Sequence, residues 1–256
     1  MSQTIISLTT IPPRFDRLGP TLASLCTQSA RIDRIILWLP ADYRWRGFEM
    51  TPPPPVPSGV EVRTAQDFGP ATKLLPALGA ADTDDALILY CDDDKIYKPR
   101  WAEGLVRAAS AAPLQAHAWA GCGLAEIRTR HLARRGLDAQ LTALSGGLLQ
   151  PLKWRRPRHG PIDIAFGYGG VAVRPRFFAP SVFALPPGCL VDDIWISGQL
   201  AVTGTAIHKL PGPAPIANRR SAERAPLKSE TQHGLDRAAA DDETARYLAD
   251  NYGVWR

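Results

Sequence analysis

Three consecutive aspartates, Asp92, Asp93 and Asp94, form the sharpest polar cluster in the sequence. They follow the apolar run 86–90, whose length and composition predict a buried strand. Side chains of a strand alternate between faces, so we expect Asp92 and Asp94 to project the same way and Asp93 elsewhere. Adjacent carboxylates repel, and Mg²⁺ or Mn²⁺ would relieve the repulsion and bind a diphosphate. The alternative is an acidic turn that caps the following segment.

A second acidic pair, Asp192 and Asp193, precedes apolar residues at helical spacing. A carboxylate near a reacting centre can remove the proton of an attacking hydroxyl. An aspartate at a helix start can instead act as a cap or a favourable dipole partner. The glycine-rich stretch 167–170 upstream favours the catalytic interpretation, and capping stays open.

Lys73, Tyr168 and Trp195 are further candidates for substrate contacts. We expect Lys73 in the first turn of a short helix over residues 72–78, where the dipole favours anions. A bound anion would explain it, with Lys73 reaching a phosphate; the alternative is an exposed surface lysine. Tyr168 and Trp195 could stack on a sugar ring or belong to the core.

The elements that must position these residues alternate between strand and helix in the first half of the chain. Apolar runs predict strands at 5–8, 34–39, 86–90 and 171–173. Alternating apolar and polar residues predict a further strand at 60–63, and 205–208 is strand-like. Helical spacing predicts helices at 18–25, 72–78, 101–112 and 193–201. This pattern is typical of an α/β fold with a parallel sheet covered on both faces, whose ligands bind outside the carboxyl ends of the strands. The polar segment 212–242 is expected to be mobile, and 245–255 ordered.

Composition and charge narrow the class of protein. The 256 residues, 45% hydrophobic and 21% charged, suit one soluble globular domain. No apolar stretch is long enough for a bilayer and the N-terminus does not look like a secretory signal, so we expect a cytoplasmic protein. A net charge of +5 suits an anionic ligand or weak attraction to an anionic membrane face, and argues against nucleic acid. The basic run 153–159 is either a solvated loop or a phosphate or lipid patch.

The cysteines do not suggest a structural role. The sequence has four, Cys26, Cys91, Cys122 and Cys189, with no CxxC pair. We therefore expect neither a zinc site nor a disulfide framework, but mostly buried thiols.

Three segments together carry a family resemblance. Residues 87–97, LILYCDDDKIY, resemble the DXD region of GT-A-fold glycosyltransferases. Residues 5–28 are similar to the first strand and helix of the family-2-like members, and 192–195 resemble their downstream acidic motif after a glycine loop. The resemblance covers most of residues 3–205. It implies a GT-A (Rossmann-like) fold, with a mixed, mostly parallel central sheet flanked by helices in a single domain. Residues 1–97 would form the nucleotide-binding half, 98–211 the acceptor and catalytic half, and 212–256 a partly mobile C-terminal tail.

The resemblance also implies roles on the donor side. Asp92 would contact the ribose or nucleotide and Asp94 would ligate the metal, with Asp93 in the same donor-binding cluster. The residues that would lie near the base and phosphates are Thr9, Thr10 and Arg14. The family often supplies one C-terminal histidine to the metal; we favour His233 over His208, and the alternative is that both are ordinary exposed histidines.

On the acceptor side, Gly169 and Gly170 would lie beside the donor sugar and the acceptor. Asp193 would be the general base of an inverting enzyme, with Asp192 as the second choice. The implied reaction moves a sugar from a nucleotide-sugar, favouring UDP, to a hydroxyl of a saccharide or of a glycan- or lipid-linked acceptor. It would need Mn²⁺ or Mg²⁺, and membrane association would be at most peripheral.

Two other functions remain open from sequence. A sugar-phosphate nucleotidyltransferase would ordinarily have a glycine-rich phosphate loop after the first strand, unlike residues 9–13. A non-catalytic nucleotide-sugar-binding module would keep the first aspartate cluster and have no use for the second acidic pair.

Overall fold

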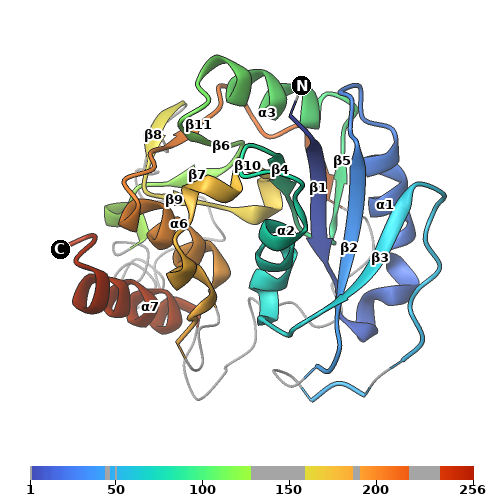
Figure 1. Cartoon of the computed structure of the whole chain (residues 1–256), viewed down its shortest axis with the longest axis horizontal. Helices are drawn as coiled ribbons and strands as arrows, with labels where there is room; N and C mark the ends of the chain where they lie inside the picture. Colours follow the sequence, from blue (N-terminus) through green and yellow to red (C-terminus); the bar gives the residue numbers. More distant parts are fainter. Residues whose placement is uncertain (1, 44–46, 50, 128–158, 187–190, 219–236) are drawn as a thin grey trace, which may run out of the picture.

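The computed structural model describes residues 2–43, 47–49, 51–127, 159–186, 191–218 and 237–256 (Figure 1). An eight-stranded mixed sheet runs through the molecule in the order β3-β2-β1-β4-β10-β6-β11-β8. Its strands are β1 Thr4–Thr9, β2 Arg34–Pro40, β3 Val60–Ala65, β4 Leu87–Tyr90, β6 Ala116–Ala118, β8 Gly160–Ile162, β10 Val171–Val173 and β11 Ile207–Lys209. The first four strands along the chain are mutually parallel, and β10 runs antiparallel to both β4 and β6. The expected mixed α/β sheet is confirmed.

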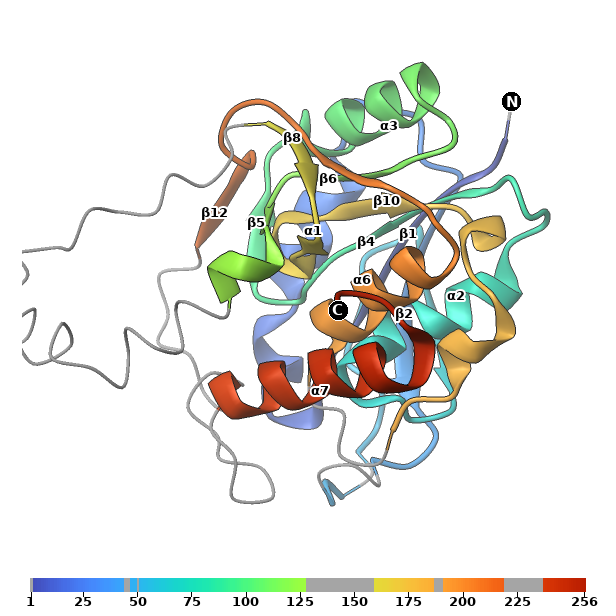
Figure 2. The same cartoon turned by 90° about the vertical axis from the view of Figure 1, so that its left-hand side faces the viewer.

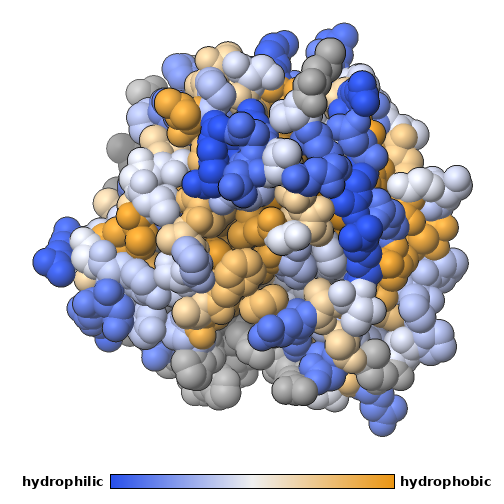
Figure 3. Space-filling view, viewed as in Figure 1, coloured by the Kyte–Doolittle hydropathy of each residue, from blue (hydrophilic) through white to orange (hydrophobic). Residues whose placement is uncertain are grey.

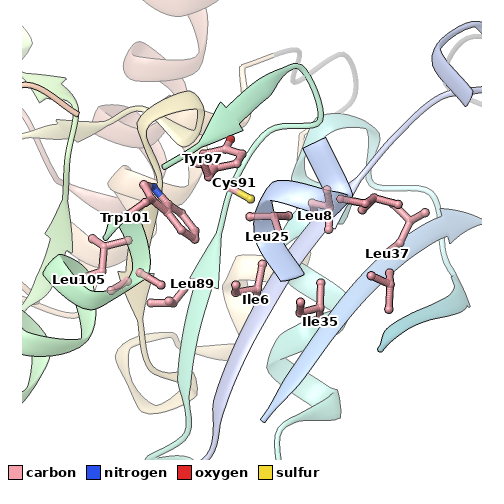
Figure 4. Packing of buried hydrophobic residues seen from close by; sticks show 14 of the residues in the cluster. Ile6, Leu8, Leu25, Ile35, Leu37, Leu89, Cys91, Tyr97, Trp101 and Leu105 are labelled. Atoms are coloured by element: carbon pink, nitrogen blue, oxygen red, sulfur yellow. The ribbon is translucent and has the colours of Figure 1, made fainter. Parts of the chain in front are cut away.

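Helices cover both faces of this sheet. The helices are α1 Gly19–Cys26, α2 Leu75–Ala80, α3 Trp101–Ala111, α6 Asp192–Val202 and α7 Arg237–Tyr252. Along β1, Ile6 and Leu8 pack with α1 and α3, whereas Ile5 faces α2 and α6, because adjacent strand residues point to opposite faces. Figure 4 shows Ile6, Leu8 and Leu25 in the first of these two cores. The sheet is therefore buried on both sides, as its continuous apolar strands predict.

Helix α7 forms an additional layer outside α6. It lies across the front of the molecule in Figure 2, and its Leu248 is fully buried against Gly198 of α6. A Cβ at Gly198 would come within 2.3 Å of Leu248 Cδ1, so the two helices approach closely here. Figure 3 shows that hydrophobic residues also gather on the molecular surface over α2 and α6. Within the described residues, no helix is both long and apolar enough to span a bilayer.

Short elements complete the frame around the strand ends. Five 3₁₀ turns occur in the described residues: η1 Pro12–Arg17, η2 Gly69–Lys73, η3 Gly167–Gly169, η4 Pro175–Phe177 and η5 Pro180–Phe183. Two small ribbons pair β5 Lys95–Tyr97 with β12 Ile216–Asn218, and β7 Gly121–Cys122 with β9 Ile164–Ala165. The β5–β12 ribbon joins the segment after the three aspartates to the C-terminal part of the chain.

One sequence expectation about an element was wrong. The helix expected over 72–78 is divided into η2, which ends at Lys73, and α2, which begins at Leu75. Pro76 explains the break, because it lacks an N–H and fits only the first turn of a new helix. The segment 212–242, expected to be mobile, contains β12 and the start of α7, while 219–236 lie outside the described residues.

The expectation of mostly buried thiols is only partly met. Cys91 and Cys122 are buried, whereas Cys26 is exposed at the end of α1. Cys189 lies outside the described residues.

Candidate active site

The three aspartates lie in a turn at the carboxyl end of β4, between β4 and β5. We call residues 92–94 the acidic turn. Asp93 is buried and accepts hydrogen bonds from Thr10 Oγ1 at 2.6 Å and Arg14 Nη1 at 2.7 Å. Thr21 of α1 also donates to the Asp93 carbonyl oxygen at 2.9 Å. Burial raises the pKa of Asp93, and the charge of Arg14 opposes that rise.

These contacts change the expected roles of the residues after β1. Thr10 and Arg14 were expected near the nucleotide base and phosphates; in this structure they bind Asp93. Thr9 Oγ1 donates to the Trp38 carbonyl oxygen at 2.9 Å, so it ties β1 to β2. The residues that support the acidic turn are thus Thr10 and Arg14, which follow β1.

Asp92 pairs with a different residue, Lys73. Lys73 Nζ lies 2.5 Å from Asp92 Oδ1 and 2.7 Å from Asp192 Oδ2. Burial disfavours the charged amine, yet Asp192 and Asp92 hold the pKa of Lys73 well above its usual value. Burial also opposes the ionisation of Asp92, yet Lys73 keeps the pKa of Asp92 below its usual value.

This placement corrects both expectations for Lys73. The residue is 5% exposed, so it is not a surface lysine, and it ends η2 instead of beginning a helix. Sequence reasoning missed its pairing because residues 73, 92 and 192 are far apart along the chain. The available signal was a lone lysine among apolar residues in a segment that reads as buried.

Asp94 meets the requirement for a metal ligand. Its Oδ1 atom is buried without a hydrogen-bond partner in the described part of the chain, although Lys95 Nζ lies 3.2 Å away. A divalent cation would satisfy such an oxygen. The described residues hold no complete set of three or more His, Cys, Asp or Glu ligands. Magnesium-type sites commonly use one or two carboxylates and complete the shell with substrate phosphates and water, so Asp94 and Asp92 fit such an ion.

The acidic pair of α6 divides into two environments. Asp192 is buried and paired with Lys73, whereas Asp193 is half-buried and its Oδ1 accepts a hydrogen bond from Gly167 N at 2.9 Å. Both lie in the first turn, where the helix dipole favours anions, and Val191 is the N-cap without a side-chain cap bond. Of the two, Asp193 is the one accessible to a substrate.

The glycines of residues 167–170 approach neighbouring residues closely, and the expected place of Gly169 and Gly170 beside the donor sugar and the acceptor stays a prediction. A Cβ at Gly169 would lie 2.6 Å from Ala120 Cβ, and one at Gly170 would lie 2.4 Å from the Trp101 ring. Gly170 also has a φ of +92°, which disfavours other residues. Gly167, instead, approaches the charges: its Cβ would lie 2.5 Å from Lys73 Nζ.

Two aromatic residues that sequence reasoning missed brace the site from behind. Tyr97 Oη donates to Asp92 O at 2.9 Å and accepts from Asp92 N at 3.0 Å. Trp101 packs on Tyr97 with ring centroids 4.6 Å apart, and its Nε1 donates to Gly169 O at 2.7 Å. The acidic turn and the glycine loop 167–170 are therefore held by the same aromatic pair. The signal in the sequence was two large aromatics within ten residues after the aspartates.

The aromatic candidates for sugar stacking differ in outcome. Trp195 is fully buried, donates to Val182 O and packs against Tyr247 and Tyr252 of α7, so the expectation that it stacks on a sugar was wrong. Tyr168 is half-buried and stacks on Phe166 at 5.9 Å, so part of its surface remains accessible.

Neither histidine candidate is found at the acidic turn within the described part of the chain. His208 lies on β11 opposite His117 of β6, three strands from β4. Strands are about 4.8 Å apart, so His208 lies roughly 14 Å across the sheet from its counterpart on β4. His233 lies outside the described residues, as do positions 153–158 of the basic run.

Comparison with known proteins concerns the fold. No family model and no curated protein matches this sequence. The structure resembles glucosyl-3-phosphoglycerate synthase from Mycobacterium tuberculosis in complex with Mn²⁺, UDP and glucosyl-3-phosphoglycerate, with a TM-score of 0.54 and 17% identity over 100% of this chain and 81% of that one. The complex of the same enzyme with Mn²⁺ and UDP-glucose gives 0.52 and 18%, over 100% and 80%. A further mycobacterial protein gives 0.53 and 15%, over 100% and 76%.

The chain has the GT-A fold. At this identity the likeness extends to the fold alone. In a GT-A sheet, as in other open α/β sheets, ligands bind beyond the carboxyl ends of the strands. The acidic turn lies there, after β4, and Thr10 follows β1 at the same edge.

Proposed function

We propose that this protein is a metal-dependent glycosyltransferase that moves a sugar from a nucleoside-diphosphate sugar, with UDP favoured, to an acceptor hydroxyl. The observation that carries the proposal is the acidic turn at the ligand-binding edge of a GT-A sheet, where the buried Asp94 Oδ1 has no hydrogen-bond partner among the described residues. The similar structures support the choice of ligands, since they are described in complex with Mn²⁺ and UDP or UDP-glucose.

In this proposal, Asp94 and Asp92 hold Mn²⁺ or Mg²⁺, and His233 remains the proposed additional ligand. The bound cation neutralises the charge of the departing diphosphate. Arg14 and Lys73 were expected beside the phosphates, but both bind carboxylates here, so we assign them to holding Asp93 and Asp92 in place.

Asp193 is the proposed general base. It is the more exposed of the acidic pair, and its hydrogen bond from Gly167 N fixes its orientation beside the acidic turn. Asp192 suits the role less, because its charge is bound to Lys73. In the proposed reaction the base removes the proton of the acceptor hydroxyl as that hydroxyl attacks. A single displacement of this kind inverts the configuration of the anomeric carbon.

The donor is identified first, by thermal shift with UDP, GDP and their sugars, with and without Mn²⁺. A ligand that binds only the folded state raises the Tm. Transfer is then tested with saccharides, with glycan- and lipid-linked acceptors, and with phosphoglyceric acid and glycerol 3-phosphate, which are described as bound in similar structures. Release of pyrophosphate from a nucleoside triphosphate and a sugar phosphate would instead identify a nucleotidyltransferase. Donor binding with neither transfer nor donor hydrolysis would identify a binding module.

Two variants assign the roles. Asp94→Ala should abolish the Mn²⁺-dependent shift and lower turnover by about 10²–10³-fold, as removal of a charge-stabilising group does. Asp193→Asn should keep the donor shift and stop transfer, because the amide cannot accept the proton. Full activity of Asp193→Asn would remove it as the base.

A further inference from the structure

One buried ammonium group lies where three separate segments of the site meet. Lys73 Nζ contacts Asp92 of the acidic turn and Asp192 of α6 at 2.5 and 2.7 Å. The glycine loop closes the third side, because Gly167 leaves no room for a side chain: a Cβ there would lie 2.5 Å from Nζ. The donor-side turn, the helix that carries Asp193 and the glycine loop therefore share a single contact point.

The backbone of Lys73 is itself anchored to the sheet. Its carbonyl oxygen accepts a hydrogen bond from Ser7 Oγ of β1 at 2.5 Å, and Ser7 Oγ accepts one from Trp38 Nε1 of β2 at 3.0 Å. The side chains of Lys73 and Asp192 are each only 6% exposed. The backbone of Lys73 is thus anchored to β1, while its ammonium group binds the first turn of α6. Lys73 therefore links the N-terminal strands to a helix from the C-terminal half of the chain.

We propose that Lys73 is a positioning residue that sets the distance between the acidic turn and the start of α6, and with it the place of Asp193 relative to the donor. The inference rests on the proposed function for its catalytic consequence. Asp193 adjoins Asp192 in the first turn of α6 and accepts a hydrogen bond from Gly167 N. A shift of Asp192 would therefore also move Asp193 and its contact with the glycine loop.

The two roles open to this lysine predict different kinetic effects. A lysine that binds the diphosphate directly would, when perturbed, weaken donor binding and raise the donor KM. A lysine that acts through Asp192 would lower kcat and leave the donor KM nearly unchanged, because a displacement of about 1 Å at the reacting groups can cost about 10²-fold in rate.

Gly167→Ala perturbs the contact point without removing a charge. The new Cβ would lie 2.5 Å from Lys73 Nζ, the end of a flexible side chain, and 3.1 Å from Asp92 Oδ1, so the ion pair between these two groups must shift. We expect kcat to fall by about 10²-fold with little change in donor KM. Gly79→Ala in α2 is the matched control, since nothing lies within 4 Å of a Cβ there, and its kcat should equal that of wild type.

A double-mutant cycle tests the bridge without any enzymatic assay. Urea unfolding is measured for Lys73→Met, Asp192→Asn and the double variant. If Lys73 and Asp192 hold each other, the double variant loses less stability than the sum of the two single losses. Additive losses would overturn the proposal, and so would a Gly167→Ala enzyme with unchanged kcat or with a defect confined to donor KM. A wild-type protein that transfers no sugar overturns the proposed function, while the unfolding cycle still decides whether the bridge exists.

Discussion

Single residues at the acidic turn are held by partners from distant segments. Asp93 is bound by Thr10 and Arg14 of the first strand region, and Asp92 by Lys73. Charges removed from water are costly unless they are paired, and removing one partner leaves the other uncompensated. The stability of this turn therefore depends on two cationic side chains, Arg14 and Lys73.

Arg14→Met should destabilise the fold by about 3 kcal/mol, because it leaves the buried Asp93 carboxylate without its cation. The free energy of unfolding in urea measures the effect. Arg100→Met is the control: its side chain is 86% exposed and its Nε lies 4.0 Å from Glu103 Oε2, so the change should stay below about 1 kcal/mol. Equal losses in the two variants would contradict this account of Asp93.

Gly170→Ala should be among the most damaging small substitutions. The position combines a φ of +92° with a Cβ that would lie 2.4 Å from the Trp101 ring. Left-handed strain costs about 1–2 kcal/mol and overpacking about 1–3 kcal/mol, so we expect a combined loss of roughly 3 kcal/mol. Gly204→Ala separates the two effects, since its φ is +73° with nothing within 4 Å, and should show the strain alone. Thermal unfolding of the two variants makes the comparison.

Elements were the best predicted level of this molecule. Strands β1, β2 and β4 were predicted because each contains a continuous apolar run, and such a run has few alternatives to a buried strand. Strand β3 was predicted from its alternation of apolar and polar residues. Helix α6 was also predicted, but the prediction that its Trp195 stacks on a sugar was wrong, because this side chain is fully buried. Periodicity indicates a helix without saying how many sides it buries, and α6 is enclosed by the sheet on one side and α7 on the other. The position of Lys73 could not be predicted either, because its partners are set by tertiary packing and not by local sequence.

The starts of β1 and β2 are joined by a carboxylate, which predicts a pH dependence of stability. Asp33 Oδ2 accepts a hydrogen bond from Thr4 N at 2.8 Å, and this bond, with Arg31, lowers the pKa of Asp33. A carboxyl group with a lowered folded-state pKa stabilises the fold above its unfolded value of about 3.9 and loses that contribution as the pH falls through the folded value. Asp33→Asn should therefore be less stable than wild type at pH 7, with a difference that shrinks below about pH 4.

Urea unfolding of wild type and Asp33→Asn across this pH range gives the measurement. Asp16→Asn, at an exposed position, is the control, and its difference from wild type should stay small throughout. A constant difference for Asp33→Asn from pH 7 to pH 3 would mean that its charge does not contribute.

At the scale of the whole molecule, the C-terminal part supports both sides of the candidate site. β12 pairs with β5 directly after the acidic turn, and α7 covers the outer face of α6. β12 and α7 are therefore not accessories to the sheet, although they follow its last strand, β11. A chain that ends at residue 211 should expose Trp195 and unfold at a lower temperature, with increased binding of a hydrophobic dye.

A milder change tests the same layer in the full-length chain. Leu248→Ala, at a fully buried position on α7, should cost about 3 kcal/mol in unfolding free energy, because large-to-small changes in a core leave a cavity. A 1–211 fragment as stable as the full chain, or a Leu248→Ala variant without effect, would show that α6 does not need this cover.

The β5–β12 ribbon also bears on how the protein is made. Lys95 pairs with Asn218, a partner that lies 123 residues later in the chain (218 minus 95). At roughly 5–20 residues per second of synthesis, the acidic turn waits on the order of 10 s for this strand to leave the ribosome. During that interval the nascent N-terminal half can form its parallel strands, but β5 has an unpaired edge and Lys73 lacks its second carboxylate. The ligand-binding edge thus matures only after residue 218 has been made, later than the parallel strands of the N-terminal half.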